Sequence, residues 1–187
     1  MSEPTPFTTM LDLANGALDP QRGAIAERHL WDMGGMYLNE SGDFGNPLIY
    51  EVRPIPVTPT NSNILSSTTV LQPGDINGEY FMTKGHFHEV RSRGEIYVTL
   101  AGEGRLVLAT EDGRHAIEQM AIGAVNYIPG GWAHRSVNVG ARPLVFFAAY
   151  VGDAGHDYTT IEDRGFPVLI VKGNDAPEVV ENPRYRS

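Results

Sequence analysis

Four side chains in this sequence are of types and spacing that could bind one metal ion. His86 and His88 stand one residue apart, Glu95 follows seven residues after His88, and His134 comes after a Pro-Gly-Gly turn. Alternate residues of a strand face the same side, so an extended segment would point both imidazoles one way. A carboxylate at the start of an adjacent antiparallel strand could join them, with His134 from a further strand. Such ligands suit Fe(II), Mn(II), Co(II), Ni(II) or Zn(II), and the spacing does not rank these ions.

The segments around these residues have the composition of short β-strands. Segments rich in β-branched and aromatic residues alternate with turn residues, among them PLIYEVR, NILSSTTVLQ, GEYFMTKG, EIYVTL, GRLVLAT, AVNYIP, PLVFFAAYV and PVLIV. Many short strands at even spacing predict an all-β sandwich or barrel. Helical periodicity is scarce, and the sequence predicts only two short helices, RGAIAERHL at Arg22–Leu30 and TTIEDRG from Thr159.

Composition narrows the class of protein. The chain has 187 residues, enough for one domain with a core, which we expect to consist of an N-terminal extension (1–46), a barrel (47–173) and a C-terminal tail (174–187). It contains no cysteine, so a metal would be bound by histidine and carboxylate. The formal net charge of −9 argues against nucleic acid as a partner. No apolar run approaches the length of a membrane span and no signal peptide follows Met1, so we expect a cytoplasmic protein without membrane contact.

The stretch around His134 carries a family resemblance. GAVNYIPGGWAHRSVN fits the second cupin motif, G-x5-P-x-G-x2-H-x3-N, at Gly123, Pro129, Gly131, His134 and Asn138. The first cupin motif fits in part, because the gap from His88 to Glu95 is longer than in the general pattern. The resemblance implies an all-β fold, a single jelly-roll cupin barrel with the N-terminal extension packed on it.

The longer spacing between His88 and Glu95 is typical of a narrower group within the cupins. The sequence from Tyr50 to Phe166, above all TKGHFH at the metal-ligand segment and DAGHDY at Asp153 to Tyr158, resembles the cupin-type phosphoglucose isomerases. This resemblance implies interconversion of glucose 6-phosphate and fructose 6-phosphate, in glycolysis and gluconeogenesis. It also implies a homodimer.

The same resemblance implies the parts of an active site. One divalent metal ion per chain, Fe(II) first and Mn, Ni, Co or Zn otherwise, would be held by His86, His88, Glu95 and His134. Glu95 would move the proton between C1 and C2, unless a direct hydride shift takes its place, and His156 would assist at the ring or the hydroxyl groups. The sugar phosphate would be bound by Tyr50, Thr69, Thr83, Gly85, Tyr150 and Tyr158, with Tyr97 lining the pocket beyond Glu95.

Two other functions fit the same ligand set. An iron dioxygenase could use the three histidines and the glutamate at an O2-accessible metal. In such an enzyme the phosphate-binding hydroxyl groups would have no role. A non-catalytic cupin could bind a sugar phosphate without turning it over. Activity with fructose 6-phosphate separates the isomerase from both.

Overall fold

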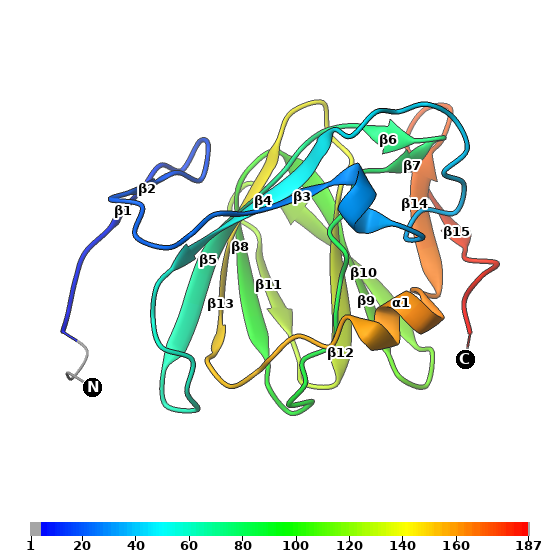
Figure 1. Cartoon of the computed structure of the whole chain (residues 1–187). Coiled ribbons are helices and arrows are strands. Elements are labelled where there is room, and N and C mark those ends of the chain that lie inside the picture. The colour runs from blue at the N-terminus through cyan, green and yellow to red at the C-terminus, as the bar shows by residue number, and fades with distance from the viewer. Residues whose placement is uncertain (1–4, 187) are drawn as a thin grey trace.

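The computed structural model describes residues 5–186, and antiparallel strands are its main elements (Figure 1). The largest sheet has six strands in the order β11-β8-β13-β5-β4-β3. Its members are β3 (Ala26–His29), β4 (Leu48–Ile55), β5 (Ile64–Leu71), β8 (Glu95–Ala101), β11 (Val125–Ile128) and β13 (Leu144–Val151). This sheet forms one layer of the molecule.

Two smaller sheets form the opposite layer. One has the order β10-β9-β12 and the other β15-β14-β7-β6. Their bounds are β6 (Asp75–Ile76), β7 (Glu79–Tyr80), β9 (Glu103–Thr110), β10 (His115–Ala121), β12 (Trp132–Asn138), β14 (Val168–Lys172) and β15 (Pro177–Glu181). A two-stranded ribbon of β1 (Met10–Leu11) and β2 (Leu18–Asp19), a 3₁₀ turn η1 (Leu30–Met33) and one helix, α1 (Thr159–Arg164), complete the elements.

This arrangement confirms the predicted all-β jelly-roll class. Within residues 5–186 the sheets are separate hydrogen-bonded units, so the two layers make a sandwich rather than one continuous barrel ladder. The segment before residue 47 supplies β3, an edge strand of the six-stranded sheet, and the segment after residue 173 supplies β15. No helix of these described residues is long and apolar enough to cross a membrane.

The two predicted helices have opposite outcomes. The helix at TTIEDRG is confirmed as α1, whereas the helix predicted at Arg22–Leu30 is wrong because Ala26–His29 is the strand β3. Its partner β4 pairs Arg28 with Tyr50 and Glu27 with Glu51. A nine-residue helix is marginal on its own, and an open strand edge supplies the backbone hydrogen bonds that overrule its propensity.

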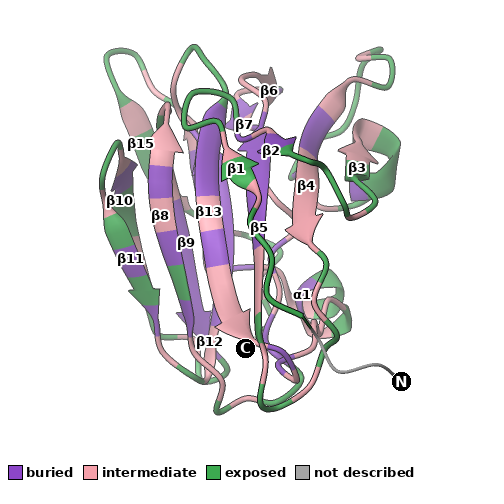
Figure 2. Ribbon diagram, turned by 90° about the vertical axis from the view of Figure 1, so that its left-hand side faces the viewer, coloured by how far each residue is buried: buried purple, intermediate pink, exposed green. Residues whose placement is uncertain are grey.

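The core lies between the layers. Leu71, Leu144 and Phe146 of the six-stranded sheet and Leu106 and Met120 of the facing sheet are at most 2% exposed. Strand β8 alternates its faces, with a buried Glu95, an exposed Ile96 and a buried Tyr97. Figure 2 shows this alternation along β8 and β11, whose outer faces carry exposed apolar side chains.

Asn138 of the second cupin motif and Gly102, which lies between β8 and β9, stabilise turns that connect the layers. Asn138 is fully buried, donates to the carbonyl oxygens of Leu71 and Arg142, and accepts the N–H of Gly140. Gly102 has a φ of +80°, and a Cβ there would collide with the carbonyl oxygen of Pro143. The asparagine therefore satisfies buried backbone groups, and the glycine permits a left-handed turn in a close approach.

Candidate metal centre and catalytic pocket

The four predicted metal ligands meet inside the sandwich. Each of His86, His88, Glu95 and His134 offers one ligand atom, and these atoms all lie within 4.8 Å of one another. Glu95 and His88 are each 4% exposed and His134 is 1% exposed. Buried charged and imidazole groups in such proximity are expected to be paired or to coordinate a metal.

The ligands come from both layers. His86 lies directly opposite His134 of β12, and each backbone N–H donates to the other residue's carbonyl oxygen, at 3.3 and 3.1 Å. Glu95 begins β8, which pairs with β11 and β13 in the six-stranded sheet. The strand of Glu95 is therefore not the neighbour of the His86–His88 segment, contrary to the expectation from sequence. The carboxylate reaches the imidazoles across the core.

Unpaired nitrogen atoms indicate that this set fits a metal. Nε2 of His86 is buried and has no hydrogen-bond partner. Nε2 of His134 is buried too, and the Glu95 carboxylate lies 3.0 Å from it without a well-formed hydrogen bond. Nδ1 of His88 lies 2.9 Å from the carbonyl oxygen of Arg93. A hydrogen bond from Nδ1–H leaves Nε2 as a lone-pair donor that faces the cluster. Three imidazole nitrogens and one carboxylate are a chemically suitable set for a divalent transition metal.

Charges in the cluster keep Glu95 ionised. Its Oε2 lies 3.2 Å from Nε2 of His88 and 3.0 Å from Nε2 of His134. Burial alone raises the pKa of Glu95, but interactions with His134 and His88 outweigh it and lower the pKa below its usual value. Burial also holds the pKa of His86 well below its usual value, so this imidazole is neutral at neutral pH. Both states are the ones that bind metals.

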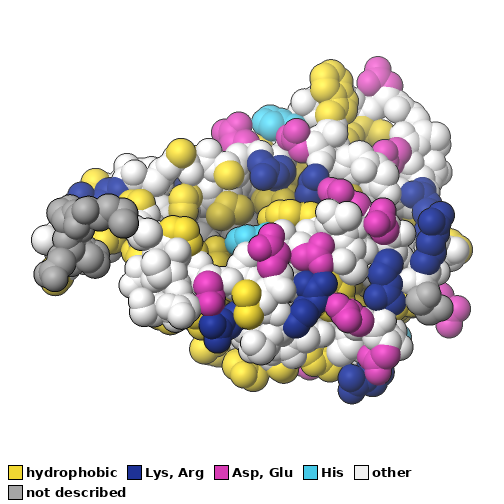
Figure 3. All heavy atoms as spheres, turned by 60° about the horizontal axis from the view of Figure 1, so that its bottom comes forward, with side chains coloured by type: hydrophobic (Ala, Val, Ile, Leu, Met, Phe, Trp, Pro, Cys, Tyr) yellow, Lys and Arg dark blue, Asp and Glu magenta, His cyan; other side chains and the backbone are white. Residues whose placement is uncertain are grey.

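A pocket of about 210 Å³ opens above the cluster. Its lining includes His86, Glu95 and His134 as well as His156, which was predicted to assist the reaction. All seven predicted substrate-binding residues line it too, namely Tyr50, Thr69, Thr83, Gly85, Tyr97, Tyr150 and Tyr158. His88 lies behind the cluster and is absent from the lining. Figure 3 shows a hollow with a largely apolar floor on this side of the molecule, with histidine and Lys or Arg side chains at its margin.

Aromatic hydroxyl groups in the pocket stay protonated. Burial raises the pKa of Tyr50 to about 12 and that of Tyr150 to about 12, and it raises the pKa of Tyr97 well above its usual value. The ring of His156 lies over Tyr158 at 5.9 Å and near His86 at 4.5 Å. The pocket thus offers neutral O–H donors around a buried carboxylate and imidazoles.

Sequence reasoning missed one cation in the pocket. Arg28 of β3 lines the pocket beside Tyr50, its partner on β4. Burial raises the pKa of Tyr158, and the positive charge of Arg28 opposes that rise. The only side-chain hydrogen bond of Arg28 among described residues goes to the carbonyl oxygen of Glu27, at 2.8 Å. The residue was missed because its segment was predicted to be a helix, so its strand pairing could not be foreseen.

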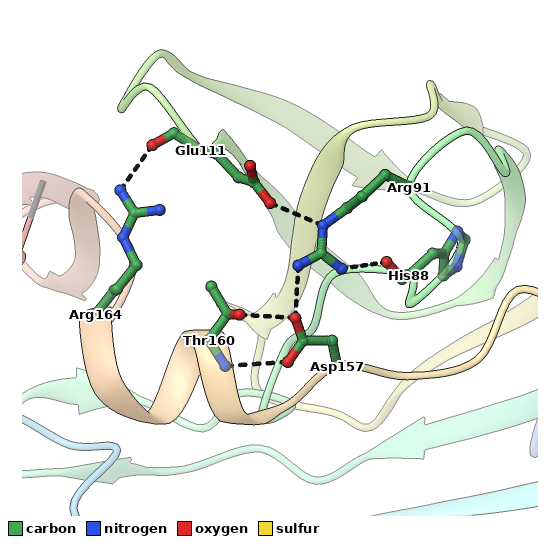
Figure 4. A network of polar contacts seen from close by, with 6 residues as sticks. All are labelled: His88, Arg91, Glu111, Asp157, Thr160 and Arg164. Carbon is green, nitrogen blue, oxygen red and sulfur yellow. Dashed lines mark hydrogen bonds and ion pairs between the residues drawn. The ribbon is translucent and has the colours of Figure 1, made fainter.

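A network of polar contacts joins the two chain segments at the pocket. Phe87 and Asp157 exchange backbone hydrogen bonds of 3.2 and 2.8 Å. The guanidinium of Arg91 donates to the carbonyl oxygen of His88, to the Asp157 carboxylate and to Glu111 (Figure 4). Asp157 also accepts from the N–H and hydroxyl of Thr160 at the start of α1. The metal-ligand segment is thereby fastened to the segment that carries His156 and Tyr158.

Comparison with known proteins gives one consistent relationship. A family model described as glucose-6-phosphate isomerase (GPI) matches residues 33–185. The glucose-6-phosphate isomerase of Thermococcus litoralis is 38% identical over 186 residues, with 97% of each chain covered. That of Sinorhizobium medicae is 32% identical, over 97% of this chain and 88% of that protein. Among solved structures, Lactobacillus farciminis oxalate decarboxylase is 21% identical with a TM-score of 0.47, covering 58% of this chain and 30% of that one.

Proposed function

The chain belongs to the glucose-6-phosphate isomerase family, and from this premise we propose that it interconverts glucose 6-phosphate and fructose 6-phosphate in the pocket above the His/Glu cluster. The observation that carries the proposal is the similarity to curated isomerases over 97% of both chains. The pocket's contents support it, since a buried carboxylate, neutral imidazoles and hydroxyl donors suit an open-chain sugar phosphate. We place the reaction in glycolysis and gluconeogenesis, and the protein in the cytoplasm.

His86, His88, Glu95 and His134 would hold one divalent ion, and we propose Fe(II) as the native metal, with Mn(II), Ni(II), Co(II) and Zn(II) as substitutes. When bound, such an ion supplies Lewis-acid stabilisation of negative charge on the sugar oxygens, an effect worth several kcal/mol. The other contributions come from the chain's own residues.

Glu95 is the group we assign to proton transfer. Isomerisation moves a hydrogen between C1 and C2 and exchanges an aldehyde for a ketone. Because its pKa is lowered, Glu95 is a carboxylate at neutral pH and able to accept a proton from carbon. The alternative is a direct hydride shift in which Glu95 only binds. Solvent deuterium incorporated at C1 or C2 during turnover supports the proton transfer, and complete absence of deuterium supports the hydride shift.

His156 is the group we assign to the hydroxyl protons and to opening of the sugar ring. Burial lowers the pKa of His156, which makes a neutral imidazole available as a base near neutral pH. Its ring lies next to Tyr158 and 5.6 Å from that of Tyr150. It therefore stands between the metal cluster and the proposed phosphate-binding hydroxyls.

The phosphate would be bound by hydroxyl groups and one backbone turn. We assign Tyr50, Thr69, Thr83, Tyr150 and Tyr158 as donors, with the N–H of Gly85 and with Tyr97 at the pocket wall. Gly85 has a φ of +73°, and a Cβ there would lie 2.7 Å from the ring of Phe166. Only glycine fits this backbone position, which exposes its amide to a ligand. Arg28 would add the positive charge that the hydroxyls lack.

The outer face of the six-stranded sheet supports a homodimer. Ile96, Val125 and Tyr127 lie side by side in β8 and β11 and are 42%, 64% and 67% exposed. Contiguous exposed apolar side chains mark an interaction surface. We propose that a second copy of the chain covers them.

We also propose that the chain consists of an extension (1–46), a barrel (47–173) and a tail (174–187).

A coupled assay tests the proposed reaction. The metal-loaded protein should convert fructose 6-phosphate to glucose 6-phosphate, which a glucose-6-phosphate dehydrogenase then oxidises with formation of NADPH. Turnover confirms an isomerase. Binding of fructose 6-phosphate without turnover, with each of several divalent ions, would instead identify a sugar-phosphate-binding protein.

A further inference from the structure

A second hollow, of about 270 Å³, lies outside the catalytic pocket and shares no lining residue with it. Its walls come from the loop after η1, from helix α1 and from the C-terminal segment, with Leu169 of β14 and the back of β12 as its floor. The size suits a small metabolite rather than a macromolecule.

Four arginines line this hollow, namely Arg135, Arg164, Arg184 and Arg186. None of them forms an ion pair among the residues that the structure describes. The hollow also contains Glu162 and Asp163, but Glu162 lies 3.5 Å from the ammonium group of Lys84. Figure 3 shows Lys and Arg side chains, with Asp and Glu side chains among them, toward the side on which Figure 1 places α1 and the C-terminus. Four arginines around one hollow are unusual in a chain with 14 Lys and Arg against 23 Asp and Glu.

Neutral acceptors hold these guanidinium groups in place. Arg184 donates to the carbonyl oxygens of Gly35, Tyr37 and Leu38. Arg164 donates to the carbonyl oxygens of Arg186 and Glu111, at 3.0 and 2.7 Å, and Figure 4 shows the second of these contacts. Backbone carbonyls fix the position of a cation without neutralising it. Like charges held together in this way raise the free energy of the site, and an anion between them lowers it.

The floor of the hollow holds a buried cation with donor capacity left. Arg135 is 4% exposed, and its Nε and Nη2 both donate to the carbonyl oxygen of Lys84. Its Nη1 donates no hydrogen bond to any residue in the range 5–186. Glu79 is also buried, and its charge favours the protonated guanidinium, but it forms no ion pair with Arg135. A guanidinium with free N–H groups matches phosphate oxygens in charge and geometry.

We propose that this hollow binds a small phosphate-bearing anion, and that its occupation changes the affinity of the catalytic pocket. The link between the two sites is short. Arg135 follows His134 in β12, binds the carbonyl oxygen of Lys84 and lies over the ring of Phe166 at 4.5 Å. Gly85 packs against both Phe166 and the Cβ of Arg135. An anion bound to Arg135 therefore acts on the turn that presents the Gly85 amide. This second clause rests on the proposed function of the pocket.

Titration with inorganic phosphate, at constant ionic strength, tests the binding clause. We would load the protein with diamagnetic Zn(II) and follow backbone amide signals by NMR. Gly34 and Gly165 report on the hollow, and Gly85 reports on the catalytic pocket. The substitutions Arg164→Gln and Arg186→Gln should weaken phosphate binding at Gly34 and Gly165 at least about tenfold, whereas Gly85 should still show saturable phosphate binding. Arg142→Gln removes an exposed arginine outside both sites and should change neither.

The outcomes separate the two sites. No saturable shift at Gly34 and Gly165, or shifts that Arg164→Gln and Arg186→Gln leave unchanged, would overturn the proposal even if Gly85 binds phosphate normally. The side chain of Arg186 makes no hydrogen bond to the described residues, so Arg186→Gln should fold normally. It therefore tests the proposal even if Arg164→Gln fails to fold. For the coupling, the dependence of KM for fructose 6-phosphate on phosphate concentration should differ between the unmodified protein and Arg186→Gln, because only the unmodified protein binds phosphate tightly in the hollow. The same dependence in both proteins would remove the coupling clause.

Discussion

The guanidinium of Arg91 bridges the Asp157 carboxylate, at 2.6 Å from Nη2 to Oδ2, and the carbonyl oxygen of His88, a member of the His/Glu cluster. Asp157 stands between His156 and Tyr158, two residues assigned to the sugar and its phosphate. One side chain outside the pocket thus fixes the distance between the metal cluster and the opposite wall. Small displacements at such a wall are costly for catalysis.

We predict that Asp157→Asn lowers kcat/KM for fructose 6-phosphate about tenfold, because the amide no longer holds Arg91 and the wall containing His156 shifts. The free energy of unfolding should change less, since a partly exposed ion pair contributes about 0.2–1 kcal/mol. Steady-state kinetics and thermal unfolding on the same preparation measure both. Asp112→Asn, which removes the exposed partner of Arg114, is the matched control.

Arg91→Lys should fail to restore the arrangement. One ammonium group cannot reach His88, Asp157 and Glu111 together as the planar guanidinium does. Kinetics of Arg91→Lys equal to those of the unmodified protein would show that the bridge has no positioning role.

We predict that Arg28→Gln raises KM for fructose 6-phosphate about tenfold and leaves kcat within about twofold, because a phosphate contact binds ground state and transition state alike. The remaining binding should also depend less on salt. Arg22→Gln serves as the control, since Arg22 lies outside the pocket and stacks on Phe7. An unchanged KM in Arg28→Gln would remove Arg28 from the substrate site.

The hydroxyl groups that we assign to phosphate binding should remain protonated at alkaline pH. Burial raises the pKa of Tyr50 and of Tyr150 to about 12, so both stay protonated and able to donate beyond pH 10, where a free tyrosine ionises. KM for fructose 6-phosphate should therefore not rise through a midpoint near pH 10. If KM does rise with a midpoint near pH 10, and Tyr50→Phe abolishes that rise, then Tyr50 is exposed to water and not buried.

We predict that Tyr127→Glu converts a dimer into a monomer, because it places a charge in the exposed apolar face of β8 and β11. Light scattering after size-exclusion chromatography measures the mass. The control is Val179→Glu, an exposed apolar residue on β15 in the other layer. A monomer before substitution, or a dimer that survives Tyr127→Glu, would contradict the assigned interface.

The metal cluster was foreseeable from sequence because local rules fix it. His86 and His88 face one way by strand alternation, and the turn before β12 delivers His134 opposite His86. The strand-and-turn pattern predicted the all-β class in the same way, and the cupin resemblance implied the jelly-roll. The sheet to which Glu95 belongs was not foreseeable, because strand order depends on pairings between residues far apart in the chain. The residue spacing predicted Glu95 as a ligand, but it did not predict that Glu95 lies in the six-stranded sheet.

The contacts of Arg28 and Arg91 could not be predicted from the sequence. Arg28 enters the pocket only because β3 pairs with β4, and local propensity favoured a helix there. Arg91 lies three positions after His88 in the sequence, but its contacts depend on Asp157, sixty-six positions further along the chain. Both residues depend on contacts that the fold creates.

The central claim is that a metal ion held by His86, His88, Glu95 and His134 drives the isomerisation. One experiment tests it: metal content by plasma mass spectrometry and the coupled isomerisation assay, on the same sample, before and after chelation. We predict about one metal ion per chain, a loss of kcat of at least about a thousandfold on chelation, equivalent to about 4 kcal/mol, and recovery with Fe(II). His134→Ala should lose metal and activity together, whereas His115→Ala, at an exposed histidine on β10, should keep both. Full activity in metal-free protein or in His134→Ala would contradict the claim.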